Sequence, residues 1–307
     1  MTFREKFREG IITAKDFTRE DIEYILKKAK EMMDGTKNRD LLRGKILATL
    51  FFEPSTRTRL SFESAMYRLG GSVIGFHSGD VSSIKKGESI ADTIRTVENY
   101  SDCIVMRHNL EGAAKMAARF SKNPIINAGS GSGEHPTQAL LDLLTITEEG
   151  HSLGGLNIGI MGDLKYGRTV HSLAILLSNY DTNIYFISPS ELMLRNRDKE
   201  LLQKREVRFK EVTQYRKILD VLDVLYVTRI QKERFADLEE YDRVKGFYTF
   251  NNEDLAKTKE GFRIMHPLPR VTEISPEIDE SNKAIYFKQT YYGIPMRKAL
   301  LAEMMKD

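Results

Sequence analysis

The amino-acid sequence predicts an α/β protein made of two doubly wound parallel-sheet domains, with the active site in the cleft between them. Short apolar runs alternate with helix-period patterns from one end of the chain to the other. Strands that alternate with helices at this spacing form parallel sheets with helices on both faces. The 307 residues are enough for two such domains, each of about 150 residues.

The elements expected in the first half begin with a helix that Thr18 caps and whose apolar face is Ile22, Ile25, Leu26 and Ala29. A buried strand is expected at 45–52, and the next helix runs from Thr56 to the Gly70-Gly71 pair. The remaining strands are expected at 72–76, 103–106 and 124–127, and the remaining helices at 90–97, 112–120 and 137–147.

A domain boundary is expected at 149–155, where Glu-Gly-His-Ser-Leu-Gly-Gly interrupts the alternation. One domain then covers 1–149 and the other 150–288, and a closing helix within 289–307 is expected to pack back on the first. The second domain has expected strands at 157–162, 183–187, 222–227 and 263–265 and a helix at 169–177. Ligands of such folds bind at the carboxyl ends of strands, so residues that follow strands are the functional candidates.

The composition excludes several classes of protein. The formal net charge is only +3, and no long run of like charges predicts a nucleic-acid-binding tail. The single cysteine, Cys103, excludes an internal disulfide and argues against a cysteine-based zinc site. The sequence has neither an apolar run long enough to span a membrane nor a signal-peptide pattern at its start. We therefore expect a soluble cytoplasmic protein that binds neither nucleic acid nor membrane.

The first candidate cluster is Ser55-Thr56-Arg57-Thr58-Arg59, directly after the 45–52 strand. Pro54 ends the strand, and Ser55 can cap the helix that follows. The first turn of a helix presents unpaired N–H groups and a positive dipole end, so hydroxyls and guanidiniums there form an anion cradle. For this segment alone, a capped helix with two solvated arginines is an equally good interpretation.

Two more clusters follow strands of the first half. Arg107 comes directly after the 103–106 strand and is expected to point into the cleft, although a surface arginine is the simpler interpretation. His135 precedes Pro136, which fixes the start of the next helix. A neutral imidazole there can donate to a carbonyl oxygen, and a histidine that merely caps or packs is the alternative.

Three segments of the second half also follow strands. In His266-Pro267-Leu268-Pro269 the prolines force an extended or turned backbone, whose carbonyl groups can accept from an NH₂ group. A rigid structural loop is the alternative. Arg168 and Arg229 each follow another strand. Paired guanidiniums suit a dicarboxylate, because each can hold one carboxylate bidentately, and they repel a cationic substrate.

The remaining polar candidates are weaker. The segment 82–88, Ser-Ser-Ile-Lys-Lys-Gly-Glu, is expected to be a mobile loop with two lysines, and a merely solvated loop is the alternative. Cys103 is expected in the core, and His171 is expected to pack or to face solvent rather than to act in catalysis. The other histidines lack metal-ligand spacing with acidic or sulfur partners. Neither a metal nor a cofactor is predicted.

Together the motifs resemble the aspartate/ornithine carbamoyltransferase family. Phe-x-x-Pro-Ser-Thr-Arg-Thr-Arg, Met-Arg-His, His-Pro-Thr-Gln and His-Pro-Leu-Pro-Arg occur in the family's order and spacing, and the resemblance covers about residues 10 to 303. The Lys-Lys-Gly-Glu loop, Gly-Asp-Leu-Lys-Tyr-Gly-Arg-Thr-Val-His-Ser-Leu and Thr-Arg-Ile-Gln-Lys-Glu-Arg resemble the catalytic chains of the aspartate-specific members. The family often has Asp where Ser130 stands and an amide where Glu134 stands.

The resemblance implies a site for carbamoyl phosphate. In the family the helix N-terminus binds the phosphate, and donors equivalent to Thr58, Arg107 and His135 reach the carbamoyl oxygen. Gln138 and two backbone carbonyl groups hold the carbamoyl NH₂. The implied ligands are Ser55, Thr56, Arg57, Thr58, Arg107, His135, Gln138, Pro267 and Leu268. The implied catalytic residues among them are Arg57, Thr58, Arg107 and His135.

The resemblance also implies an acceptor site and an assembly. Arg168 takes the α-carboxylate of L-aspartate, and Arg229 takes the side-chain carboxylate with support from Gln231. Ser82 and Lys86 reach the site from a neighbouring subunit, where Lys86 also contacts aspartate, so a homotrimer is expected. A separate regulatory chain is a further partner found in the family, and the family's metal, where present, belongs to that chain.

The implied reaction transfers the carbamoyl group of carbamoyl phosphate to the α-amine of L-aspartate, an early step of de novo pyrimidine biosynthesis. A tetrahedral intermediate forms, and the departing phosphate can accept the amine proton. No side chain is an obvious general base, so positioning and electrostatics are expected to supply most of the rate.

Two alternatives compete with this assignment. The ornithine-specific members have a cysteine where Pro267 stands here. A non-catalytic anion-binding protein of the same fold is the other alternative, and it would release no phosphate from the two substrates.

Overall fold

The computed structural model describes residues 1–34, 38–78, 87–235 and 237–306. Two compact units divide the chain, one of Met1–Leu144 and Tyr291–Asp307 and the other of Thr145–Thr290. Within the described residues each unit contains one five-stranded sheet, and every pair of neighbouring strands in both sheets is parallel. The predicted class, two parallel-sheet α/β domains, is confirmed.

The sheet of the first unit has the strand order β1-β5-β4-β2-β3. Its strands are β1 (Gly10–Ile11), β2 (Ile46–Phe51), β3 (Ser72–Phe76), β4 (Cys103–His108) and β5 (Ile125–Ser130). The helices of this part of the chain are α1 (Phe3–Lys6), α2 (Arg19–Glu31), α3 (Thr56–Arg68), α4 (Ile90–Val97), α5 (Ala113–Ala118), α6 (Pro136–Glu148) and α11 (Tyr286–Met305). Along the chain, α6 and α11 each run from one unit into the other.

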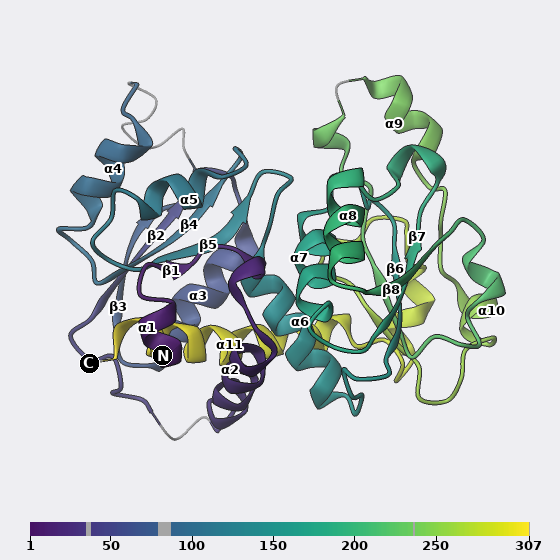
Figure 1. Ribbon diagram of the computed structural model, residues 1–307, viewed down its shortest axis with the longest axis horizontal. Coiled ribbons are helices and arrows are strands. Elements are labelled where there is room, and N and C mark those ends of the chain that lie inside the picture. Colours follow the sequence, from purple (N-terminus) through teal and green to yellow (C-terminus); the bar gives the residue numbers. More distant parts are fainter. Residues whose placement is uncertain (35–37, 79–86, 236, 307) are drawn as a thin grey trace. The chain divides into compact units, whose positions relative to one another are not determined.

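Helices cover both faces of this sheet (Figure 1). On one face, α4 and α5 pack against sheet residues that include Leu50, Ile104 and Met106. On the other face lies α3, whose predicted apolar residues Phe62, Ala65, Met66 and Leu69 are all buried. This burial leaves the N-terminus of α3 at the edge of the sheet where β2 ends.

The second unit repeats the arrangement with the strand order β10-β9-β6-β7-β8. Its strands are β6 (Asn157–Met161), β7 (Asn183–Ile187), β8 (Arg208–Val212), β9 (Val224–Val227) and β10 (Arg263–Met265). Its helices are α7 (Arg168–Leu177), α8 (Asn196–Lys204), α9 (Leu238–Val244) and α10 (Asn252–Leu255). One core cluster joins the sheet to the chain on both sides of β10, and it includes Leu225, Phe250, Ile264 and Tyr286.

Most expected elements are present, with shifted ends. Thr18 caps α2 by accepting from the Asp21 N–H, and the four predicted apolar residues of that helix are buried. The strands predicted at 72–76, 183–187 and 263–265 have the expected bounds. The strand predicted at 124–127 extends to Ser130, and the helix predicted from 289 begins at Tyr286. The sequence did not reveal β8, because an exposed edge strand does not need an apolar run.

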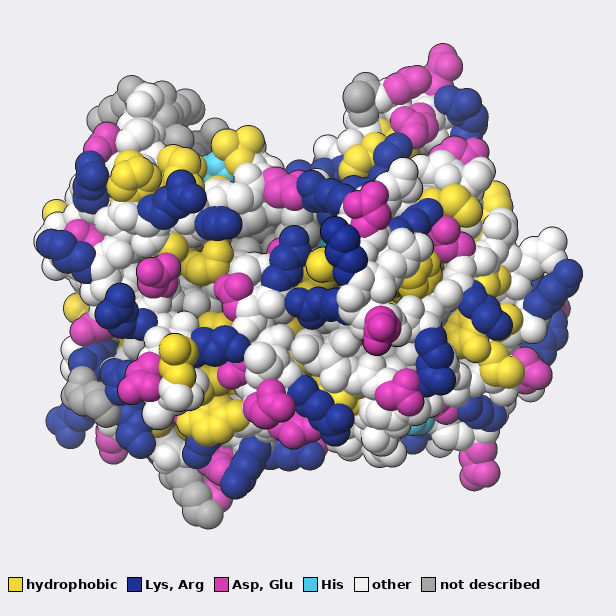
Figure 2. Space-filling model, in the orientation of Figure 1, with side chains coloured by type: hydrophobic (Ala, Val, Ile, Leu, Met, Phe, Trp, Pro, Cys, Tyr) yellow, Lys and Arg dark blue, Asp and Glu magenta, His cyan; other side chains and the backbone are white. Residues whose placement is uncertain are grey.

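The surface fits the nearly balanced charge of the sequence. Figure 2 shows Lys and Arg side chains interspersed with Asp and Glu side chains over the viewed face of both units. Within the described residues, every helix is too short or too polar to cross a bilayer.

Candidate active site

In the first unit, three predicted clusters follow strands that end at the same, carboxyl-terminal end of the sheet. Phe51 of β2 pairs in register with Arg107 of β4, and His108 pairs with Ser130 of β5. The segments that follow these strands therefore start side by side. The strand order changes direction between β2 and β4, since β3 lies on the other side of β2. Ligands of doubly wound sheets bind at such a switch point.

The N-terminus of α3 lies where the anion cradle was predicted, at Ser55 to Arg59. Ser55 stands at the N-cap with an extended backbone, and no acidic residue lies in the first turn. The expected capping bond is absent: within the described residues the Ser55 side chain makes no cap hydrogen bond. The Ser55 hydroxyl therefore makes no hydrogen bond to the first turn of α3. The N-terminus of a helix carries a positive dipole end, which favours a nearby anion.

Arg107 lies inside β4, one residue before its end, rather than after the strand as predicted. Its backbone carbonyl accepts from the Phe52 N–H at 2.9 Å, which ties the start of the β2–α3 loop to β4. The Arg107 Nε lies 3.6 Å from a carboxylate oxygen of Glu53. This carboxylate, which the sequence analysis did not single out, holds the guanidinium beside the α3 N-terminus.

His135 is buried immediately before α6. The preceding turn is closed by bonds from the Ser130 N–H to the Glu134 carbonyl and from the Gly133 N–H to the Ser130 carbonyl. The His135 carbonyl accepts from the Gln138 N–H and so forms part of the helix start. The imidazole Nδ1 lies 3.4 Å from the Thr137 hydroxyl.

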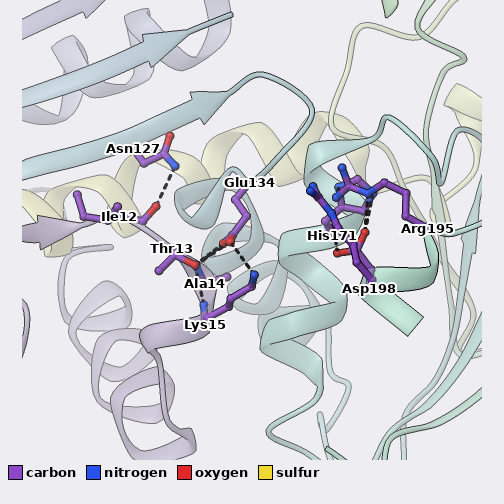
Figure 3. A network of polar contacts seen from close by, with 10 residues as sticks. Ile12, Thr13, Ala14, Lys15, Asn127, Glu134, His171, Arg195 and Asp198 are labelled. Atoms are coloured by element: carbon purple, nitrogen blue, oxygen red, sulfur yellow. Dashed lines mark hydrogen bonds and ion pairs between the residues drawn. The ribbon is translucent and has the colours of Figure 1, made fainter. Parts of the chain in front are cut away.

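Glu134 anchors this turn to the N-terminal segment (Figure 3). Its carboxylate accepts from the Ala14 N–H at 2.6 Å and from the Thr13 hydroxyl, and Lys15 lies 4.0 Å away. A second tie runs from the Asn127 side-chain amide to the Ile12 carbonyl at 2.9 Å. Burial raises the pKa of Glu134, against the hydrogen bonds from Thr13 and Ala14. The N-terminal segment thus supports the turn that presents His135.

In the second unit the two predicted arginines also follow neighbouring strands. Met161 of β6 pairs with Val227 of β9, and the Met161 carbonyl accepts from the Thr228 N–H at 2.7 Å. Arg168 begins α7 after β6, and Arg229 follows β9. The strand order reverses between β6 and β9. Both guanidiniums are therefore attached to the two loops that flank the switch point of this sheet.

Asp163 joins these two loops. Its buried carboxylate accepts from the Tyr166 N–H at 2.8 Å and from the Gln231 N–H at 3.3 Å, while its own N–H donates to the Thr228 hydroxyl. Burial raises the pKa of Asp163 to about 6, although the backbone N–H donors oppose that rise. The predicted Gln231 also donates from its side-chain amide to the Tyr166 carbonyl at 3.3 Å. Gln231 therefore belongs to the link between the loops.

Arg229 is oriented by Glu233. One guanidinium nitrogen donates to a Glu233 oxygen at 3.1 Å, and the second nitrogen contacts the other oxygen. The pairing is bidentate, which fixes the plane of the guanidinium.

His171 is packed in α7, one of the two outcomes expected for it, and it has a defined protonation (Figure 3). Its Nδ1 accepts from Arg195 at 2.9 Å, because a guanidinium is only a donor. The Nε2–H therefore donates to the Leu164 carbonyl at 2.9 Å. Asp198 accepts from Arg195 at 2.6 Å. This chain of contacts fixes the backbone of the loop that precedes Arg168.

The Pro267-Leu268 segment is held by a buried histidine. The Leu268 N–H donates to Nδ1 of His266 at 2.8 Å, so the Nε2–H of His266 donates to Glu273 at 2.7 Å. The second oxygen of Glu273 accepts from the Val271 and Thr272 N–H groups. Leu268 itself has a positive φ of 57°. These hydrogen bonds hold the backbone of the loop after β10 in one conformation.

Two predicted residues, Ser82 and Lys86, lie outside the described part of the chain. Among the described residues, no group of three or more His, Cys, Asp or Glu side chains is arranged to hold a metal ion. The sequence reasoning missed four carboxylates: Glu53, Asp163, Glu233 and Glu273. Glu233 had a usable signal, because it stands four residues after Arg229. The contacts of the other three carboxylates depend on the folded chain, so no short sequence pattern predicts them.

Models of one protein family match nearly the whole chain. The carbamoyl-P binding domain of aspartate/ornithine carbamoyltransferase matches residues 10–148. The Asp/Orn binding domain of the same family matches residues 154–304.

Individual relatives are similar over the same length. The aspartate carbamoyltransferase catalytic subunit of Thermococcus kodakarensis is 56% identical over 294 residues, which are 95% of this chain and 95% of that one. The catalytic subunit of M. jannaschii aspartate transcarbamoylase superposes with a TM-score of 0.89 at 50% identity, covering 97% of this chain and 98% of that one. The Trypanosoma cruzi aspartate transcarbamoylase in complex with carbamoyl phosphate and aspartate gives a TM-score of 0.93 at 40% identity, covering 99% of both chains. This chain therefore belongs to the aspartate/ornithine carbamoyltransferase family.

Proposed function

We propose that this chain is the catalytic subunit of an aspartate carbamoyltransferase, which transfers the carbamoyl group of carbamoyl phosphate to the α-amine of L-aspartate. The observation that carries the proposal is the pair Arg168 and Arg229 on the two loops that Asp163 joins. Two guanidiniums suit the two carboxylates of aspartate and disfavour the cationic side chain of ornithine. Pro267, at the position of the cysteine of ornithine-specific members, supports the same choice.

The first unit is the proposed carbamoyl-phosphate domain. Its phosphate ligands are Ser55, Thr56, Arg57, Thr58 and Arg107. The α3 N-terminus supports this role, because it combines N–H donors with an uncommitted serine hydroxyl and has no acidic residue in its first turn. Thr58, Arg107 and His135 are the proposed donors to the carbamoyl oxygen.

The carbamoyl NH₂ group needs acceptors rather than donors. We assign it to the Gln138 side-chain oxygen and to the backbone carbonyl groups of Pro267 and Leu268. Support for the last two comes from the His266–Glu273 pair, which fixes the backbone at Leu268. The second unit is the proposed aspartate domain, where Arg168 takes the α-carboxylate and Arg229, with Gln231, takes the side-chain carboxylate.

The reaction then follows from these contacts. The α-amine of aspartate attacks the carbamoyl carbon, and the C–O bond to phosphate breaks after a tetrahedral intermediate has formed. The negative charge on the carbamoyl oxygen is stabilised by the donors from Thr58, Arg107 and His135, each worth about 3–4 kcal/mol. The amine proton goes to the departing phosphate, so no side chain is required as general base.

The proposed assembly is a homotrimer in which Ser82 and Lys86 complete the site of a neighbouring subunit. Exposed apolar side chains on the first unit support contact with another copy, since Leu60 and Tyr67 of α3 are 50% and 62% exposed and Ile74 lies on the edge strand β3. A regulatory chain is a further proposed partner, suggested by the name "catalytic subunit" of the relatives. The expected cytoplasmic location stays a prediction.

Phosphate release from carbamoyl phosphate, with and without L-aspartate, tests the proposal. We expect release that depends on aspartate and that matches the N-carbamoyl-L-aspartate formed mole for mole. A correctly folded oligomer that binds phosphate but releases none from the two substrates would instead be an anion-binding protein.

A further inference from the structure

A buried carboxylate stands one helical turn after Gln138 in α6. The side chain of Asp142 is fully buried, and one of its oxygens accepts from the Gln138 side-chain NH₂ at 2.9 Å. Residues four apart on a helix lie on the same face, so the contact follows directly from the helical spacing. Asp142 has no role in the proposed site so far.

The contact determines which end of the Gln138 amide points toward Asp142. An ionised carboxylate has only acceptors, so the amide must present its NH₂ group to it. The carbonyl oxygen of Gln138 then points the other way. Within residues 1–34, 38–78, 87–235 and 237–306, this oxygen accepts no hydrogen bond. Gln138 therefore offers a ligand its carbonyl oxygen, which is an acceptor.

A buried cation favours the ionised, acceptor form of Asp142. Arg297 of α11 is only 3% exposed, and its guanidinium carbon lies 4.8 Å from the centre of the Phe62 ring of α3. Burial lowers the pKa of Arg297 to about 10, and the charge of Asp142 opposes that fall. Arg297 is therefore still a cation near neutral pH, and its charge favours the ionised carboxylate.

The fold makes room for this cation at Gly293. A Cβ atom at position 293 would lie 3.0 Å from an Arg297 terminal nitrogen and 3.3 Å from the Ser61 hydroxyl. The guanidinium thus lies where α3, α6 and α11 meet. These are the helices that carry the phosphate cradle, Gln138 and Arg297 itself.

We propose that Asp142, with Arg297 as its counter-charge, is a positioning residue that turns the oxygen of Gln138 toward the carbamoyl NH₂ and so selects that group in the donor substrate. This inference rests on the proposed function, because it takes Gln138 to bind the carbamoyl NH₂. Asp142 itself does not contact the substrate. An inverted amide would direct an NH₂ at an NH₂, so the two donors would oppose each other.

Acetyl phosphate provides a matched probe, because it has a methyl group where carbamoyl phosphate has NH₂. The measurement is the ratio of the two dissociation constants, acetyl phosphate over carbamoyl phosphate, by calorimetry on the intact oligomer. In Asp142→Asn the Arg297 cation attracts the asparagine oxygen, and the asparagine NH₂ then faces Gln138 and inverts its amide. We expect the ratio to fall about tenfold, as for one lost hydrogen bond, while acetyl phosphate binding changes less than about twofold.

The outcome separates a positioning role from a structural one. If Asp142→Asn weakens both ligands equally, so that the ratio is unchanged, the proposal is overturned. Ser61→Ala removes another buried polar group of the same cluster without touching Gln138, and it should leave the ratio unchanged. Wild-type protein that binds neither ligand would overturn the proposed function itself.

A second variant covers the case in which Asp142→Asn does not fold, since it leaves a buried cation without its carboxylate. Asp142→Asn combined with Arg297→Gln removes both charges and keeps a donor at position 297. Replacing a buried charge pair by neutral groups is often tolerated. The ratio should again fall, by about threefold or more. A folded double variant with the wild-type ratio would overturn the proposal.

Discussion

The carboxylate of Asp163 accepts from the backbone N–H of Gln231 at 3.3 Å and thereby joins the loop after β6 to the loop after β9. The first loop leads to Arg168 and the second carries Arg229. One buried acid therefore sets the spacing of the two guanidiniums proposed to bind aspartate.

Asp163 should make stability depend on pH. Its folded-state pKa, about 6, lies above the ordinary value of 3.8, so the protonated form stabilises the fold at low pH and this contribution is lost as pH rises through about 6. Because asparagine does not titrate, Asp163→Asn should not lose stability in this way as pH rises. Between about pH 4 and pH 7 the variant should gain roughly 2–3 kcal/mol of unfolding free energy relative to wild type. Urea unfolding at both pH values measures the difference, and a difference that does not change with pH contradicts the assignment.

Glu233 should control the binding of aspartate but not of carbamoyl phosphate. Glu233→Gln keeps the shape of the side chain and removes the charge that orients Arg229. We expect KM for aspartate to rise about tenfold, as for a lost charge-assisted hydrogen bond. Steady-state kinetics and calorimetry with carbamoyl phosphate measure the two effects. The exposed Glu260→Gln in the same unit is the control, and an unchanged KM in Glu233→Gln would show that Arg229 needs no orientation.

His135 should act on the rate more than on phosphate affinity. His135→Ala removes one proposed donor to the developing oxyanion, so kcat should fall about 10²- to 10³-fold. The dissociation constant of inorganic phosphate should change less than about threefold, because the proposed site of that anion is the α3 N-terminus. A large loss of phosphate affinity at unchanged kcat would instead place His135 beside the phosphate group of carbamoyl phosphate and not beside its carbamoyl oxygen.

Glu134 should tolerate an amide but not a truncation. Glu134→Gln keeps an oxygen that can accept from the Ala14 N–H and the Thr13 hydroxyl, so kcat should stay within about twofold. Glu134→Ala removes both anchors, and we expect a lower kcat together with a loss of about 1–3 kcal/mol of stability. Equal activity in the two variants would show that the N-terminal segment does not support His135.

The shared site can be tested by mixing inactive chains. Arg57→Ala disables the phosphate cradle, and Lys86→Ala disables the residue expected to come from a neighbour. Dissociated and reassociated mixtures of the two should regain part of the wild-type activity, because some sites receive neither substitution. If mixed trimers form and remain inactive, Lys86 acts within its own subunit or not at all.

The sequence alone predicted the fold class and most of the buried strands. Those predictions rest on apolar runs and caps that act locally, such as Thr18 at the start of α2. The edge strand β8 was missed because its exposed, charged residues carry no such signal. Ser55 was placed correctly at the N-cap, but the pattern could not show that its hydroxyl makes no capping bond within the described residues.

The candidate site was predicted through its cations and hydroxyls, which stand directly after strands. Its carboxylates were harder to find, because three of the four depend on contacts that only the fold creates. Asp163 meets Gln231 across 68 positions of sequence, and Glu53 meets Arg107 across two neighbouring strands. The position of the proton on the His266 ring follows from contacts with Leu268 and Glu273, and no sequence pattern predicts these contacts.

The choice of acceptor is the most direct test of the proposed function. The measurement is kcat/KM for L-aspartate and for L-ornithine at saturating carbamoyl phosphate. With Arg168 and Arg229 at the acceptor site, aspartate should be preferred by at least about 10³-fold, because ornithine has no side-chain carboxylate for Arg229 and places a repelled cation near it. Faster turnover of ornithine than of aspartate would contradict the assignment.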